Sequence, residues 1–389
     1  MSNQLTVRYG IINGAYWMAY AAISAYVSLY LLEMGFSSGT IGVLIALSGL
    51  LSALLQPLAA SYADRENSPP LKAITLSVAL LQLLCGLGLL VFHKNKVASL
   101  LLYGSCLALL QLLTPLVNGL AVTSINCGCR LNYGISKSTG SVTFALVCFI
   151  LGRVTAVRGG QPVPWAILAF TGLFILAVLR YPAQRAPRAA DAAKGADGLT
   201  FFKKYPRFTG VLSGCILLYI SHVFLNSFTL QIIRAKGGDS SHMGLSMALA
   251  ALAELPTMLL FTRLLRRRSS GFYMKLTGFF FFIKAVGSWL APNVTVYYLF
   301  QLTQIGAWAL IAIASVYYVN AIMEPQDAVK GQAYYTAAYT LANVFGSLLG
   351  GRLIDTLGVN AMLFLGTLFA TLGTAVNLVF AEKTVDKGI

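Results

Sequence analysis

Long apolar runs with almost no charge recur from one end of this chain to the other. A helix needs about 20 mostly apolar residues to cross the hydrocarbon core of a bilayer. The runs are too long for strands, and they lack the alternation typical of a membrane barrel. They predict an all-α integral membrane protein with twelve transmembrane helices, at residues 9–32, 41–62, 73–92, 98–122, 139–157, 164–180, 209–233, 244–262, 274–291, 295–319, 332–354 and 360–380.

Composition agrees with a membrane location and excludes other classes of protein. Hydrophobic residues make up 57% of the chain and charged residues only 10%, against about 25% charged residues in soluble domains. A cytosolic enzyme, a nucleic-acid-binding protein and a disordered protein are therefore excluded. With the N-terminus inside, most of the 28 Lys and Arg fall in inner segments, and such an excess marks cytoplasmic loops. The sequence predicts cytoplasmic N- and C-termini, membrane lipids as partners and no nucleic-acid partner.

A polar stretch at 181–208 divides the chain into two similar halves. The segment GFSSGTIG at 35–42 has the counterpart GGDSSHMG at 237–244, an offset of 202. The sequence therefore predicts an N-terminal six-helix bundle at 1–180, a cytoplasmic linker at 181–208 and a C-terminal six-helix bundle at 209–389. Parallel repeats of this kind are typical of secondary transporters.

Three ionisable side chains lie deep within the predicted spans. An ionisable group facing lipid costs roughly 2.5–3.5 kcal/mol, so such groups normally face the bundle interior. Glu254, Lys284 and His222 lie about 15–20 Å from a helix end at 1.5 Å per residue. We interpret all three as candidates for proton coupling, and Lys284 also as a candidate for substrate binding. The alternatives are a Glu254–Lys284 pair that only locks two helices together and a His222 that only packs. Asn226, four residues after His222, should share its face and is a further candidate for substrate binding.

Further polar and aromatic side chains repeat at helical spacing and are candidates for substrate binding. Tyr and Trp can stack on a sugar or an aromatic ring while offering a hydrogen bond. Packing between helices is the more common role of such stripes and stays open as the alternative. The candidates are Tyr16 and Tyr20 on the first helix, Gln301, Gln304 and Trp308 on the tenth, and Tyr339 on the eleventh.

Several segments resemble the major facilitator transporters. The loop ASYADRENSPP at 60–70 is similar to a degraded form of their loop signature, with Asp64 and Arg65 present and the later Gly and basic residues missing. The segments RLNYGISKSTGSVTF at 130–144 and GQAYYTAAYTLANVFGSLLGG at 331–351 resemble the lactose, nucleoside and phenylpropionate permease group. This resemblance implies the major facilitator fold, proton symport with Glu254 and Lys284 in the coupling region, and conformational gating by Asp64, Arg65 and Arg130.

The same resemblance implies positions for the solute, with departures. In lactose permease, an acid on the fourth helix and a basic residue at the start of the fifth bind the sugar. The matching positions here are Asn118 and Lys137, and Phe144 matches the stacking Trp. Loss of the acid argues against galactoside recognition in that form. Gln304 stands where the group often has a titratable His, which narrows proton coupling to Glu254 and His222.

These observations predict a secondary transporter that carries a sugar, nucleoside or aromatic acid together with a proton. The proton would be the only coupling ion, with no cofactor or metal, and the resemblance implies a monomer in a bacterial inner membrane. A proton-driven exporter or an uncoupled facilitator is the alternative. A membrane enzyme is less well supported because no nucleophile, metal or cofactor constellation is visible, and a receptor because the loops are short. The CGC tripeptide at 127–129 is interpreted as a reduced structural pair.

Overall fold

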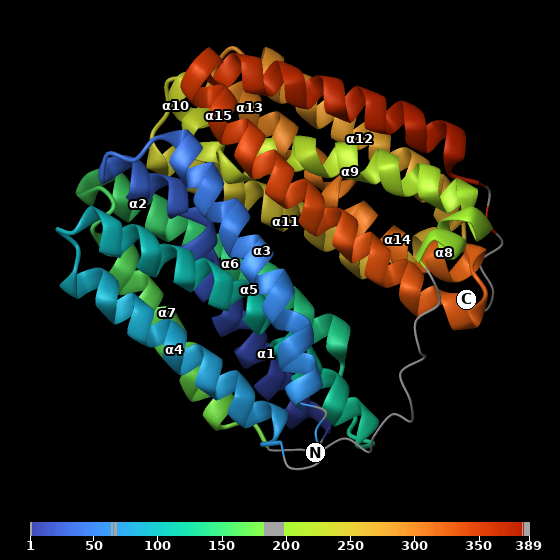
Figure 1. Ribbon diagram of the computed structural model, residues 1–389, viewed down its shortest axis with the longest axis horizontal. Coiled ribbons are helices and arrows are strands. Elements are labelled where there is room, and N and C mark those ends of the chain that lie inside the picture. Colours follow the sequence, from blue (N-terminus) through green and yellow to red (C-terminus); the bar gives the residue numbers. More distant parts are fainter. Residues whose placement is uncertain (1, 64, 66–67, 183–197, 383, 385–389) are drawn as a thin grey trace. The chain divides into compact units, whose positions relative to one another are not determined.

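The computed structural model describes residues 2–63, 65, 68–182, 198–382 and 384. The regular elements among these residues are helices of α, 3₁₀ or π type. The chain forms two compact units. The first comprises Met1–Ala190 and Asp239–Ala248, and the second Asp191–Gly238 and Leu249–Ile389. Each unit is described by itself. Figure 1 shows the first in blue and green and the second mainly in yellow, orange and red.

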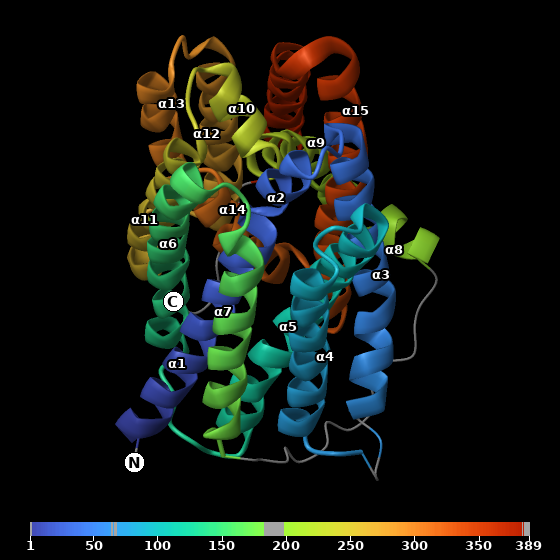
Figure 2. The ribbon, with the colours of Figure 1, turned by 90° about the vertical axis from the view of Figure 1, so that its left-hand side faces the viewer.

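The first unit is a bundle of long helices joined by short connections (Figure 2). Helix α1 packs against α6 and α7, α5 packs against α3 and α4, and α4 packs against α7. The first span changes from α1 to a short π-helix, η1, directly after Tyr20, and such bulges are frequent at functional sites. The helices are α1 Ser2–Tyr20, η1 Ala21–Ala25, α2 Val27–Glu33, α3 Ser38–Ala63, α4 Leu71–Val91, α5 Lys96–Asn126, α6 Tyr133–Arg158 and α7 Pro162–Leu179.

The second unit has helix α15 packed along α9 and α12. Its bounds run from α8 Gly198–Lys204 through α9 Pro206–Ser227, α10 Thr229–Ala235, α11 Ser240–Leu265, α12 Ser270–Leu290, α13 Val294–Gln301, the 3₁₀-helix η2 Leu302–Ile305 and α14 Trp308–Ile322 to α15 Pro325–Phe380. The first residues of α11, up to Ala248, belong to the first unit. Part of the predicted linker is thus helical, because α8 lies within it and α9 begins at Pro206.

The predicted spans correspond to helices, with two differences in how they are divided. Among the described residues, ten helices are long and apolar enough to cross a membrane. One of them, α15, contains the last two predicted spans, and only Gly358, with φ of 84°, departs from helical geometry between them. Glycine adopts this left-handed conformation without the steric cost of a Cβ. Thus α15 consists of two helices that meet at a kink, and the kink lies between the two predicted spans. The second difference concerns the ninth predicted span. It corresponds to helix α12, which carries Lys275 and Lys284 and is not among these ten helices.

The internal repeat expected from the sequence has the same backbone geometry in both copies. Helix α3 spans Ser38–Ala63 and α11 spans Ser240–Leu265, so both ends are offset by 202 residues. The glycines before them, Gly35 and Gly237, both have φ of 82°. Phe228, which separates α9 from α10, is offset by the same 202 residues from Tyr26, which precedes α2. The two copies thus share helix ends and helix breaks.

Close packing of α6 on α1 depends on a missing side chain. A Cβ on Gly140 would overlap the indole of Trp17 and the amide of Asn13. We expect Gly140→Ala to destabilise the protein by about 1–3 kcal/mol, the usual cost of overpacking, measured as a lower midpoint of thermal unfolding in detergent. Gly172→Ala on α7, where a Cβ would meet nothing within 4 Å, is the control. Equal effects of the two substitutions would contradict the prediction.

Candidate functional site

Three polar side chains of the second unit form a hydrogen-bonded chain across three spans. Lys284 Nζ on α12 donates to Gln304 Oε1, and Gln304 Nε2 donates to Glu254 Oε1 on α11 at 3.1 Å. Lys284 is 2% exposed and Gln304 4%. Among the described residues, no ion pair joins Lys284 directly to Glu254. The two expected charges are therefore brought together by an amide that stands between them.

The tenth predicted span breaks where Gln304 lies. Gln304 belongs to the 3₁₀-helix η2, and Ala307, with ψ of −96°, separates it from α14. Thr257 Oγ1 donates to the Ile305 carbonyl at 2.6 Å, and Thr277 Oγ1 donates to the Ala307 carbonyl at 2.8 Å. Carbonyls released from a helix must find other donors inside a membrane. Threonines of α11 and α12 supply these donors, so the break is stabilised by the helices that carry the charges.

The eighth span carries a proline close to its carboxylate. Pro256 lies inside α11, two residues after Glu254. Proline has no backbone N–H, so the carbonyl four residues earlier loses its usual helical partner. The chain from Lys284 to Glu254 is thus flanked by two weakened helices.

His222 is packed against an aromatic ring. Its imidazole stacks on Trp308 with ring centroids 4.5 Å apart and an interplanar angle of 4°, and it meets the edge of Phe281 at 5.9 Å. The side chain is 3% exposed, and Nδ1 has no hydrogen-bond partner among the described groups. His222 therefore packs against other side chains, as the sequence allowed. One of its ring nitrogens stays available to a ligand.

Trp308 joins His222 to a cluster of tyrosines, which we call the aromatic cluster: Tyr219, Trp308, Tyr335 and Tyr339. Trp308 lies 5.1 Å from Tyr339 and 5.9 Å from Tyr219, and Tyr219 lies 5.3 Å from Tyr339 between ring centroids. Tyr335 is buried, whereas Trp308 and Tyr339 are half-buried. The cluster therefore offers partly accessible ring faces next to the imidazole.

Two other candidates of this unit occupy different environments. Gln301 is 5% exposed, and its Nε2 has no hydrogen-bond partner among the described residues. Asn226 is exposed near the end of α9, although it is four residues from the buried His222. Both residues lie within α9, but Asn226 is exposed whereas His222 is buried.

The first unit carries a second aromatic group around the predicted residues of the first helix. Trp17 and Tyr20 lie 4.8 Å apart, and Phe144 of α6 lies 6.1 Å from Trp17 and 6.4 Å from Tyr20 between centroids. These three rings are half-buried. Tyr16 is 2% exposed, and its hydroxyl donates to the Leu110 carbonyl at 3.0 Å. Tyr20 and Phe144 thus share one accessible ring surface, whereas Tyr16 is tied to α5.

Asn118 and Lys137 meet at a third residue. The Tyr133 hydroxyl donates to Asn118 Oδ1 at 3.4 Å, and Lys137 Nζ lies 5.6 Å from the centroid of the Tyr133 ring. An ammonium group over an aromatic face gains electrostatic attraction from the ring. The two positions implied by the resemblance are therefore linked through Tyr133, which the sequence argument did not single out.

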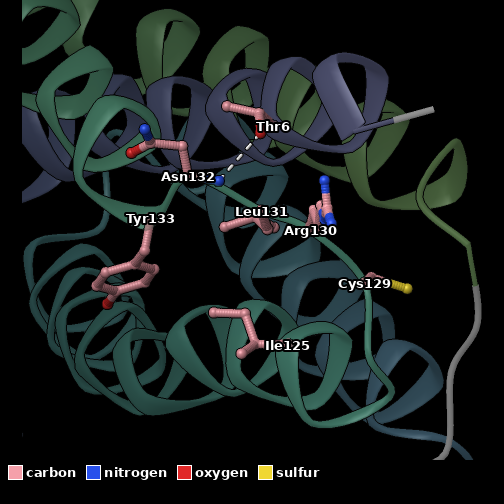
Figure 3. A pocket seen from close by; sticks show the side chains of 7 residues that line it. All are labelled: Thr6, Ile125, Cys129, Arg130, Leu131, Asn132 and Tyr133. Carbon is pink, nitrogen blue, oxygen red and sulfur yellow. Dashed lines mark hydrogen bonds between the residues drawn. The ribbon is translucent and has the colours of Figure 1, made fainter.

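The expected gating residues lie at the surface of the first unit or outside the described residues. Arg130 is exposed and lines an open hollow of about 630 Å³ formed by Thr6, Ile125, Cys129, Leu131, Asn132 and Tyr133 (Figure 3). Arg65 is exposed, with its guanidinium 6.0 Å from the centroid of the Tyr62 ring. Asp64 lies outside the described residues. No group of three potential metal ligands occurs in the part of the chain that the structure describes.

Residues 9–365 match the model of the MFS_1 like family, which covers most of the chain. The chain belongs to the major facilitator superfamily. It is an integral membrane protein and a secondary transporter of small molecules, not an enzyme. Among curated proteins, none matches the sequence.

Solved structures share the transporter's fold over almost their whole length. A variant of the nucleoside transporter NupG has a TM-score of 0.82 and 14% identity, with 97% of this chain and 98% of that chain covered. An auto-inhibited peptide transporter of the POT family has a TM-score of 0.70 and 12% identity, covering 99% and 98%. A bacterial homolog of the human lysosomal transporter Spinster, inward-facing and occupied, has a TM-score of 0.69 and 14% identity, covering 97% and 96%.

A cluster of ion pairs on the transporter's second unit lies away from the candidate site. Lys204, at the end of α8, pairs with Glu324 and Asp327 at 2.8 Å each, and these contacts, led by Asp327, raise the pKa of Lys204. Phe201 of the same helix packs on Tyr334 with centroids 4.9 Å apart. Helix α8 is thereby attached to the start of α15. A polar linker gives little signal for such a helix, although the FFKK sequence at 201–204 is amphipathic.

Proposed function

We propose that this transporter carries a sugar, nucleoside or aromatic acid together with a proton by alternating access. In this proposal the two six-helix halves, 1–180 and 209–389, joined by the linker at 181–208, move against one another in a single monomer. The protein would lie in a bacterial inner membrane with both termini in the cytoplasm, as the distribution of Lys and Arg favours.

The hydrogen-bonded chain from Glu254 through Gln304 to Lys284 is the observation that supports proton coupling. A carboxylate inside a membrane bundle is costly, and such groups commonly serve proton relays. Because an amide separates Glu254 from the ammonium group, the carboxylate can gain or lose a proton without breaking a direct salt bridge. We propose Glu254 as the proton carrier, Lys284 as the charge that responds to it, and His222 as a second titratable group.

Ring clusters in each of the two units, taken separately, favour a solute with a ring of its own. The aromatic cluster with His222, and the rings Trp17, Tyr20 and Phe144, combine stacking surfaces with hydrogen-bonding edges. Tyr and Trp can stack on the ring of a sugar or a nucleoside while offering a hydrogen bond. A nucleoside is the first solute to test, because the similar fold of NupG belongs to a nucleoside transporter.

Uptake into proteoliposomes tests this function. A thermal-shift screen of sugars, nucleosides and aromatic acids first selects a solute. An imposed gradient, acidic outside, should then drive accumulation of that solute, and a protonophore should abolish it. Counterflow that persists without any pH dependence would instead identify a facilitator. Accumulation driven only by the opposite gradient would identify an exporter.

Removal of the Trp308 indole should weaken solute binding. We expect Trp308→Ala to raise Kd by about tenfold and Trp308→Phe by less, because an aromatic pair contributes roughly 0.5–1.5 kcal/mol beyond the area it buries. Titration of the purified protein measures Kd. Trp165→Ala, on the 65% exposed Trp of α7, is the matched control. An unchanged Kd in Trp308→Ala would remove the aromatic cluster from the solute site.

A further inference from the structure

The helices α12 and α13 pack closely, and their contacts define which residues face each other. They are antiparallel neighbours, joined by residues 291–293. A Cβ on Gly287 would overlap the ring of Phe300, and one turn earlier Lys284 contacts Gln304. In this register Ser288 stands at the level of Gln301, one turn beyond the Lys284–Gln304 contact and nearer the connection at 291–293.

Both residues at that level carry buried polar atoms. Ser288 is 0% exposed and Gln301 5%. Ser288 Oγ and Gln301 Nε2 have no hydrogen-bond partner among the described residues. Buried polar groups are almost always hydrogen-bonded, to protein or to ordered water. Two such atoms on neighbouring helices would both be satisfied by a small polar molecule bound beside them.

Their neighbours decide which molecule fits. A Cβ on Gly287 would overlap the Phe300 ring, so α12 and α13 are in close contact here, and water rather than an organic solute would satisfy isolated polar atoms between them. Four residues separate Ser288 from Lys284 and three separate Gln301 from Gln304, so both lie on the faces that carry the charged chain. Water at this level would extend the chain by one helical turn.

We infer that Ser288 and Gln301 form a water-binding site that connects Lys284 and Gln304 to the solvent beyond the connection at 291–293. Protons and hydration reach Lys284 through this site without passing the aromatic cluster. The inference rests on the proposed proton coupling for its role, whereas the water site itself can be tested without a transported solute.

Thiol labelling tests the site directly. Ser288→Cys in proteoliposomes is treated with the small water-soluble reagent aminoethyl methanethiosulfonate, and modification at residue 288 is followed by peptide mass spectrometry. A thiol reacts as the thiolate, which forms only where water is present. We expect position 288 to react at least about tenfold faster than Phe279→Cys, because Phe279 is an exposed apolar residue of α12 that faces lipid. Equal, slow reaction at both positions would overturn the water site.

Transport then tests the role of the site. The variant Ser288→Ala should slow gradient-driven uptake by about tenfold, consistent with losing an ordered water, while counterflow at equal pH stays unchanged. The matched control is Ser347→Ala, at a buried serine of another helix. Fast labelling with unimpaired gradient-driven uptake would overturn the proton path. Wild-type protein without gradient-driven uptake would instead refute proton coupling and leave the water site standing.

Discussion

Glu254→Gln should abolish accumulation of solute against its gradient while leaving counterflow intact. The amide of glutamine can still accept the hydrogen bond that Gln304 Nε2 donates to Glu254 at 3.1 Å, so the packing of α11 is preserved. It cannot carry a proton. Coupling is a free energy between two binding events, and without the proton site an imposed pH gradient does no work on the solute. The accumulation ratio in proteoliposomes should fall to about one.

A second carboxylate provides the control for this experiment. Glu324 is exposed and pairs with Lys204 outside the bundle interior, so Glu324→Gln should keep wild-type accumulation. Full gradient-driven accumulation in Glu254→Gln would show that Glu254 does not couple the proton. Loss of both accumulation and counterflow would place Glu254 in solute binding or folding.

Lys284→Met should destabilise the protein, and Glu254→Gln should restore part of the loss. Lys284 is 2% exposed and donates to Gln304. Removing one member of a buried charged set leaves the other uncompensated and costs roughly 3 kcal/mol or more, whereas neutralising both members is often tolerated. The double variant should therefore have a higher midpoint of thermal unfolding than Lys284→Met alone. The restoration would be a coupling energy measured by a double-mutant cycle.

Lys275 is the control position for the loss of a lysine side chain. It lies on the same helix, is half-buried and has no ion pair among the described residues. We expect Lys275→Met to change stability by only about 0.5 kcal/mol. A double variant as unstable as Lys284→Met would contradict energetic coupling between Lys284 and Glu254.

The number and placement of the spans could be predicted because hydrophobic length is written directly in the sequence. The repeat could also be predicted, because Gly35 and Gly237 both occupy a left-handed conformation that favours glycine. Charge scarcity singled out Glu254 and Lys284, and the structure places both in one hydrogen-bonded chain. Each of these predictions depends on a property that a single residue or run carries by itself.

Other features depend on several helices at once and could not be predicted. Residues 302–307 contain no proline that would signal a break, and the break there depends on hydroxyls from α11 and α12. Gln304 was expected at the solute, and its position between two charges follows from the conformation of η2. Asn226 shows the same limit, because its exposure at the end of α9 depends on which helices pack there. The identity of the side chain that lies between two others depends on the tertiary structure and not on a local sequence pattern.

The turn at Gly358 also determines how much of α15 the bilayer can cover. At 1.5 Å per residue, the arm formed by residues 359–380 is about 33 Å long, close to the roughly 30 Å thickness of the hydrocarbon core. The arm formed by residues 325–357 is about 50 Å long by the same rise. If Gly358 marks one face of the membrane, the longer arm extends some 20 Å past the hydrocarbon of the other face, through the headgroup layer. The carboxylates that hold Lys204 lie at that end, so α8 is anchored to a part of the helix that stands in water.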